Sequence, residues 1–309
     1  MKIHYLGPEG TFTHEAASKF FSPIGQVELI ASKSIPSILS EIESEDGALG
    51  VVPFENSVHG IVIPTLDSLI FDHEKIKIVG EVSIPVTFGA YCKIPDPKNI
   101  DTVISHPHAL AQCRQFITDR GLLERTANST ADACKLIAEG NDTAIVAIAS
   151  SAAAKKFGLH PLSENIEDYL GAVTRFFVLG LEYKIPKFNH RSLIALLPPR
   201  DDVGTIAEFS QVFQKMEINI YEIHTRPTKK SLGQYIFILS LGSDVSKGDG
   251  YLAMTKLVNM GYQLRIVGMF ESDETVHPEA PYAVIPGLKG SENFEEFVAS
   301  KFKSEKSTA

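Results

Sequence analysis

Short apolar runs that end in small polar loops, each followed by a segment with helical apolar spacing, recur through the first half of this 309-residue chain. The run 3–6 leads through a glycine loop into the helical segment 11–21. The run 27–31, the helical segment 35–43 and the buried run 48–52 repeat this order. Strands that alternate with helices in this way predict an α/β fold with parallel strands.

The same alternation continues to about residue 182 and predicts a second α/β lobe. Strands are expected at 76–84, 88–92, 102–105 and 143–149, with a helix at 109–119. A further strand, 175–181, is followed by the polar, proline-marked stretch 184–190. Because composition changes there, we place a domain boundary at that stretch.

The residues after this boundary predict a different unit. A strand at 192–198 precedes a helix whose apolar residues share one face, and strands, a helix and a last strand follow at 218–225, 234–241, 251–259 and 264–270. The order βαββαβ is typical of a ferredoxin-like fold. We therefore predict one domain over 1–182, a second over 190–272 and a tail over 273–309 whose end, 303–309, is disordered.

Charge and cysteine content limit the classes of partner. Thirty-eight acidic and 29 basic residues give a net charge of −9, which argues against a duplex nucleic-acid partner. Cys92, Cys113 and Cys134 show no paired spacing, which suits a reducing cytoplasm. We find neither a signal peptide nor an apolar run of about 18 residues, so no membrane association is expected.

Three loops that follow predicted strands concentrate small polar residues. They are 7–13, 55–60 and 105–110. A helix that begins in such a loop presents free backbone N–H groups, so an acidic protein can bind a carboxylate there without many lysines. The alternative is that Thr11, Thr13, Ser57 and Ser105 only cap helices.

A fourth feature is the strand opening Thr174-Arg175-Phe176. Arg175 has the planar donor pair that grips a carboxylate, and Thr174 can donate to a hydroxyl. The alternative is an ordinary surface arginine on a strand.

A metal site is not predicted. His59 and His73, with Asp67 or Glu55, match no known ligand spacing.

Taken together, these segments resemble the prephenate dehydratases. The family's GPxGTFT opening, PxENS loop, SHPxALAQC segment and TRF triplet occur here in order at 7–13, 53–57, 105–113 and 174–176, with His108 where glutamine is usual. Residues 192–270 resemble the family's ACT domain. Its GALV motif stands here as Gly204-Thr205-Ile206-Ala207 and its ESRP motif as His224-Thr225-Arg226-Pro227.

The resemblance implies a two-lobed catalytic domain like a type II periplasmic binding protein, followed by a ferredoxin-like ACT domain. Lobe 1 would comprise about 1–80 and 167–182 and lobe 2 about 81–166, with the chain crossing near 80–84 and 163–167. The substrate would lie between the lobes.

The resemblance also implies the reaction, in which prephenate loses carbon dioxide and water to give phenylpyruvate without a cofactor. Expelling the ring hydroxyl needs a hydrogen bond or proton at that oxygen. We assign Thr174 to this hydroxyl and Arg175 to a carboxylate, and His106 and Glu55 remain alternative proton sources. The catalytic set is Thr174, Arg175, Glu55, Asn56 and Ser57, and the substrate-binding set is Thr11, Ser105, His106 and Phe176.

Regulation by L-phenylalanine is the last implication, through two ACT domains paired in a homodimer or homotetramer. The residues implied are Gly204, Thr205, Asn219, His224, Thr225, Arg226 and Pro227. Because both motifs are altered, we expect weaker or broader effector recognition. The alternatives are an arogenate dehydratase, a non-aromatising prephenate decarboxylase and a non-enzymatic amino-acid sensor.

Overall fold

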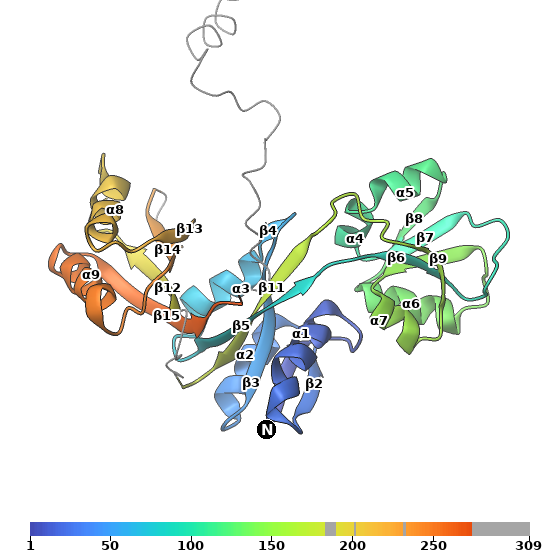
Figure 1. Cartoon of the computed structure of the whole chain (residues 1–309), viewed down its shortest axis with the longest axis horizontal. Coiled ribbons are helices and arrows are strands. Elements are labelled where there is room, and N and C mark those ends of the chain that lie inside the picture. Colours follow the sequence, from blue (N-terminus) through green and yellow to red (C-terminus); the bar gives the residue numbers. More distant parts are fainter. Residues whose placement is uncertain (183–189, 201, 231–232, 274–309) are drawn as a thin grey trace, which may run out of the picture. The chain divides into compact units, whose positions relative to one another are not determined.

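A computed structural model describes residues 1–182, 190–200, 202–230 and 233–273 of the chain. Their strands form two sheets (Figure 1). The first sheet has the order β13-β14-β12-β15-β5-β11-β3-β1-β2, and the second has the order β10-β6-β9-β7-β8. Except for Asp273, the predicted tail lies outside the described residues, as does nearly all of the stretch at which we placed the domain boundary.

The N-terminal part of the first sheet has the predicted parallel strands. β1 (Lys2–Leu6) lies between β2 (Glu28–Ser32) and β3 (Leu49–Asn56) and is parallel to both. Helix α1 (Phe12–Phe21) packs buried alanines and Phe21 against one face, and α2 (Ile35–Ser44) packs isoleucines against the other.

Two long strands from distant parts of the sequence complete this half of the sheet. β3 is followed by β4 (Gly60–Ile61), α3 (Ile63–Asp67) and η2 (Ser68–Asp72), and then by β5 (Lys77–Pro85). β11 (Val173–Gly180) lies between β3 and β5 and is antiparallel to both. β11 runs in this opposite direction because the chain returns along it from the second sheet.

The second sheet is built from one continuous stretch of chain. It contains β6 (Gly89–Cys92), β7 (Thr102–Ser105), β8 (Leu123–Thr126), β9 (Ile145–Ala149) and β10 (His160–Glu164). Helices α4 (Pro107–Ala111) and α5 (Arg114–Asp119) cover one face, and α6 (Thr130–Glu139) and α7 (Ser151–Lys156) cover the other (Figure 1).

One predicted helix differs in this region. The predicted crossing at 80–84 lies within β5, which ends at Pro85, and the second sheet begins with β6 at Gly89. The single helix predicted at 109–119 is broken into α4 and α5. The break has a tertiary cause, since the Asp168 carboxylate accepts hydrogen bonds from the backbone N–H groups of Arg114 and Gln115 at 2.8 and 3.1 Å.

Residues 190–273 have the predicted βαββαβ order. It runs through β12 (His190–Leu197), α8 (Thr205–Lys215), β13 (Ile220–Pro227), β14 (Tyr235–Leu241), α9 (Gly248–Asn259) and β15 (Gln263–Glu271). The two helices share an apolar core with one face of these strands. Residues of the other face, including Leu193 and Phe270, are in a core cluster with Leu66 and Phe177 from the first half of the chain.

β15 joins this unit to the first sheet. It pairs in parallel with β5 at Gly268 and Ile78. A Cβ atom on Gly268 would lie 2.3 Å from the Ile78 Cβ, so only glycine allows the two strands to approach this closely. No helix within the described ranges is long and apolar enough to cross a membrane.

Candidate active site

A cavity of about 350 Å³ is lined by residues that follow strands of both sheets. Its walls combine aromatic, aliphatic, hydroxyl and amide side chains with three histidines. The described residues that line it include no lysine, arginine, aspartate or glutamate. They are Leu6, Gly7, Thr11, Phe12, Thr13, Pro53, Asn56, His59, Val62, Val86, Phe88, His106, His108, Ala109, Gln112, Asn128, Ser129, Thr130, Thr174 and Phe176.

Thr174 and Asn56 form the best-defined polar pair of this cavity. Asn56 Nδ2 donates to Thr174 Oγ1 at 2.9 Å. The orientation of the amide is fixed because Asn56 Oδ1 accepts from the backbone N–H groups of Val58 and His59 at 2.9 and 3.0 Å. The Thr174 oxygen is thus an acceptor, and within the described residues its O–H donates to no other group. Its proton is available to a bound molecule.

The structure does not bring Arg175 to the cavity. Its guanidinium, which is nearly buried, lies among three carboxylates. Nη2 is 2.8 Å from Glu55 Oε2 and 2.7 Å from Glu222 Oε1, and Nη1 is 3.6 Å from Glu81 Oε2. Neighbouring side chains of a strand point to opposite faces, so Thr174 and Phe176 face the cavity while Arg175 faces the glutamates.

Burial and charge act in opposite directions on this cluster. Burial raises the pKa of Glu81 above its ordinary value, although Arg175 and Arg191 oppose the change. Burial also raises the pKa of Glu222, but the nearby His224 ring and Arg175 outweigh it and the net shift is downward. Burial lowers the pKa of Arg175, but the three carboxylates raise it by more, so the net shift is upward and the guanidinium stays charged.

The other predicted catalytic and substrate-binding residues divide into two groups. Thr11, His106 and Phe176 line the cavity, and Thr11 also caps α1. Glu55, Ser57 and Ser105 do not line it. They hold the framework together: Glu55 pairs with Arg175, the Ser57 hydroxyl accepts from Val173 N at 3.0 Å, and the Ser105 hydroxyl donates to Ile148 O at 2.6 Å.

Several lining residues were not assigned from the sequence. Gln112 is buried, and its Oε1 has no hydrogen-bond partner among the described residues. Asn128, Ser129 and Thr130 lead into α6, where Ser129 accepts from Asp132 N at 3.0 Å. A Ser-Thr pair before an amphipathic segment is a helix-start signal that could have identified this loop.

The residues considered for a metal are separated. Asp67 binds Arg226, Glu55 binds Arg175, and His73 Nδ1 lies 3.0 Å from Glu43. In the described part of the chain, no group of three or more His, Cys, Asp or Glu side chains is placed to hold a metal ion.

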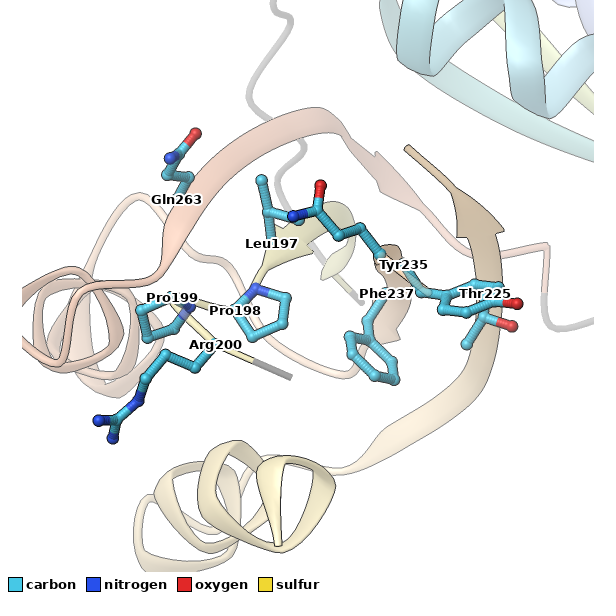
Figure 2. Close-up of a pocket in the computed structure, with 9 residues that line it drawn as sticks. Leu197, Pro198, Pro199, Arg200, Thr225, Tyr235, Phe237 and Gln263 are labelled. Carbon is cyan, nitrogen blue, oxygen red and sulfur yellow. The ribbon is translucent and has the colours of Figure 1, made fainter. Parts of the chain in front are cut away.

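A second cavity, of about 450 Å³, lies in the C-terminal unit. Figure 2 shows Pro198, Phe237, Tyr235 and Thr225 around it, with the Arg200 guanidinium pointing away from them. The remaining described lining residues are Leu197, Pro199, Gln234 and Gln263. Its wall combines the apolar rings of Pro198, Pro199 and Phe237 with the polar side chains of Arg200, Thr225, Gln234 and Gln263.

The seven residues predicted to bind an effector are all described, and Thr225 alone among them lines this second cavity. Gly204 and Thr205 begin α8, and His224 Nε2 lies 3.5 Å from Glu222 Oε2. Asn219 is exposed and Pro227 ends β13. Arg226 grips Asp67 of α3 with two hydrogen bonds, of 2.6 and 2.8 Å.

Comparison with known proteins agrees with this architecture. The family model described as prephenate dehydratase matches residues 3–184. The prephenate dehydratase of Methanocaldococcus jannaschii is 36% identical over 248 residues, which are 79% of this chain and 89% of that protein.

Two solved structures are also similar. The prephenate dehydratase of Staphylococcus aureus has a TM-score of 0.77 at 26% identity and covers 88% of this chain and 100% of its own. A prephenate dehydratase from Arthrobacter aurescens in complex with L-Phe has a TM-score of 0.78 at 24% identity and covers 97% of both chains. At this identity the likeness supports a shared fold. Because the family model spans more than half of the chain and a relative that is 36% identical matches most of its length, this chain belongs to the prephenate dehydratase family.

Proposed function

We propose that this enzyme converts prephenate to phenylpyruvate, carbon dioxide and water at the cavity that contains Thr174. The observation that supports this best is the Asn56–Thr174 hydrogen bond of 2.9 Å. It occupies a lone pair of the threonine oxygen and leaves the O–H for the departing hydroxyl of the substrate.

The reaction is an elimination in which electron pairs shift through the ring without net oxidation or reduction. As the bond between the ring and its carboxylate breaks, its electrons enter the ring, and the electron pair of the opposite C–O bond leaves with the hydroxyl. That oxygen needs one proton to become water. Thr174 stabilises the oxygen by hydrogen bonding in the transition state.

We assign the proton to His106, which lines the cavity, rather than to Glu55, which does not. Burial and the neighbouring His108 lower the pKa of His106, so its protonated form is a stronger acid than an ordinary imidazolium. Water can also supply this proton.

Arg175 is in our proposal a positioning residue. Arg175 pairs with Glu55, which is next to Asn56 in the sequence. Arg175 itself lies between Thr174 and Phe176 on β11. Loss of this ion pair would disturb both partners of the Asn56–Thr174 hydrogen bond.

We further propose the family's domain organisation. Residues 1–182 form two lobes of the type II periplasmic-binding-protein kind around the cavity, and 190–272 form a ferredoxin-like ACT domain. The strand order β13-β14-β12-β15 supports the latter. An effector such as L-phenylalanine is favoured by the second cavity, whose wall has both apolar rings and polar side chains, and by the relative in complex with L-Phe.

Pairing of two copies is proposed through β13, which ends the order of the first sheet among the described strands. Tyr221 and Ile223 on this strand and Tyr235 on β14 are about half exposed. A cytoplasmic location is supported by Cys92, Cys113 and Cys134, which are free and buried.

In the test, the purified protein is incubated with prephenate and phenylpyruvate is measured spectroscopically. In a separate arm, it is incubated with arogenate and phenylalanine is measured. We expect phenylpyruvate from prephenate, formed about 100-fold or more slowly by Thr174→Ala than by the wild type. Tight binding of prephenate without turnover would favour the amino-acid sensor, and phenylalanine formed from arogenate alone would favour the arogenate enzyme.

A further inference from the structure

We propose that His59 and His108 bind the pyruvyl carboxylate of the substrate, an inference that rests on the dehydratase function proposed above. The first observation is a mismatch of charge. Prephenate carries two carboxylates, yet the described residues that line the cavity include no lysine or arginine. Arg175, the arginine nearest in sequence to Thr174, is engaged by Glu55, Glu81 and Glu222. The cationic groups available in the lining are therefore imidazoles.

The two histidines approach each other from different sheets. His59 follows β3 in the first sheet, and His108 lies on α4 after β7 in the second. Their ring centroids are 4.9 Å apart at an interplanar angle of 51°, so the rings are neighbours without being stacked flat. Both residues are exposed although they line the cavity, which places them at its rim. Two N–H donors at one rim can share a carboxylate.

His59 is also tied to the reacting end of the cavity. Its backbone N–H donates to Asn56 Oδ1 at 3.0 Å, and the same amide donates to Thr174 at 2.9 Å. A carboxylate held by the His59 ring is thereby positioned relative to the Thr174 hydroxyl through one side chain.

The third histidine has a different role. His106 Nδ1 accepts from the His108 backbone N–H at 3.3 Å, so this nitrogen caps α4 and does not point to the rim. The His106 and His108 ring centroids are 5.1 Å apart. His106 is the remaining titratable side chain in the described lining, and burial favours its neutral form. His59 and His108, which are exposed at the rim with neighbouring rings, are therefore the imidazoles placed to donate to a carboxylate there.

The chemistry identifies which carboxylate is bound. The ring carboxylate leaves as carbon dioxide, and a cation on it would stabilise the ground state and slow its loss. The pyruvyl carboxylate is retained, so holding it improves binding equally in the ground state and the transition state. The histidine pair should consequently affect KM and leave kcat nearly unchanged.

The experiment compares the wild type with His59→Gln, His108→Gln and the double variant, because glutamine keeps a hydrogen-bonding side chain without the titrating charge. His160→Gln, on the exposed strand β10 outside the cavity, is the matched control. Far-ultraviolet circular dichroism and the Tm establish that each variant folds. The kcat and KM for prephenate are measured from about pH 5.5 to 8.5, which brackets the ordinary imidazole pKa of about 6.5.

We expect the wild-type KM to rise as pH increases through this range. The double variant should raise KM at least about tenfold at the acidic end, the loss expected for one charge-assisted hydrogen bond, and should flatten its pH dependence. Phenylpyruvate keeps only the pyruvyl carboxylate. Its inhibition constant should therefore rise by the same factor in the double variant.

An unchanged KM in the double variant, or a fall in kcat with KM constant, overturns the inference. A raised KM with an unchanged inhibition constant for phenylpyruvate overturns the assignment to the pyruvyl carboxylate. A wild type that forms no phenylpyruvate contradicts the dehydratase function itself, which separates the two failures.

Discussion

Nη2 of Arg175 lies 2.7 Å from Oε1 of Glu222, and this ion pair joins the strand that contains Thr174 to β13 of the C-terminal unit. In the order of the first sheet, β14, β12, β15 and β5 stand between β13 and β11. The pair is therefore a direct side-chain contact between strands that are not neighbours. Glu222, in the proposed regulatory part, thus helps to position Arg175, which is next to the proposed hydrogen-bond donor Thr174.

Thr174→Ala should fold and bind prephenate normally but lose about 100-fold or more in kcat, because only the hydrogen bond to the departing hydroxyl is removed. Thr174→Ser, which keeps the hydroxyl, is the matched control and should retain most activity. Steady-state kinetics and the Tm distinguish these outcomes. Turnover of the alanine variant near the wild-type rate would remove Thr174 from the mechanism.

Arg175→Lys should lower the free energy of unfolding by about 2 kcal/mol, since one ammonium cannot satisfy three carboxylates around a buried site. The kcat should fall because Glu55 and β11 lose their common partner, while KM changes little. Denaturant unfolding and steady-state kinetics provide both numbers. A large rise in KM with normal stability would instead mean that Arg175 contacts the substrate.

Glu222→Gln should separate effector binding from its effect on catalysis. Arg175 retains Glu55 and Glu81, so turnover without effector should remain near the wild-type value. Calorimetry should show similar binding of L-phenylalanine, with inhibition reduced. Because coupling is reciprocal, prephenate should also lose its effect on phenylalanine affinity. Full inhibition of the variant would place the coupling elsewhere, and no heat with phenylalanine, tyrosine or tryptophan would contradict sensing.

Glu81→Gln tests the upward pKa shift caused by burial. In the wild type, the Glu81 carboxyl loses its proton near pH 4.3 in the unfolded chain and at a higher pH in the folded protein. The free energy of unfolding therefore falls as pH rises between these two pKa values, and it is constant above the folded pKa. Glutamine has no such loss. The stability of the variant relative to wild type should therefore increase with pH. A pH-independent difference in urea unfolding would contradict the shift.

Gly268→Ala should weaken the joint between β15 and β5, because the added methyl would lie 2.3 Å from the Ile78 Cβ. Val267→Ala is the control. It lies at the neighbouring buried position, and it removes volume without adding a clash. We expect a lower Tm for both variants, with loss of phenylalanine inhibition at constant phenylalanine affinity for Gly268→Ala alone. Normal inhibition in that variant would show that the joint does not transmit regulation.

The order of helices and strands could be predicted from the sequence because local apolar patterns determine it. The cavity positions of Thr11, Asn56, His106, Thr174 and Phe176 also follow from loops at the ends of predicted strands. The family resemblance was needed to connect those loops with one reaction.

The environment of Arg175 could not be predicted in this way. Strand alternation separates its side chain from those of Thr174 and Phe176, but it does not tell which of the two faces borders the cavity. The answer depends on Glu222, which is distant in sequence and reaches Arg175 only in the folded chain. Asp168 likewise breaks the helix predicted at 109–119 through a tertiary contact. The hydroxyl groups of Ser57 and Ser105 are occupied by backbone partners that no local pattern reveals.

The different construction of the two sheets has a consequence for how the chain folds during synthesis. The described strands of the second sheet come from the uninterrupted stretch between Gly89 and Glu164, so all of them are synthesised before β11. The first sheet is completed later, because β11 must insert between β3 and β5 after the second sheet has been made. Until that insertion, the edges of β3 and β5 have no partner between them. The strand that completes the first sheet also carries Thr174, so the hydrogen bond between Asn56 and this hydroxyl can form only after the long-range pairing of β11 with β3.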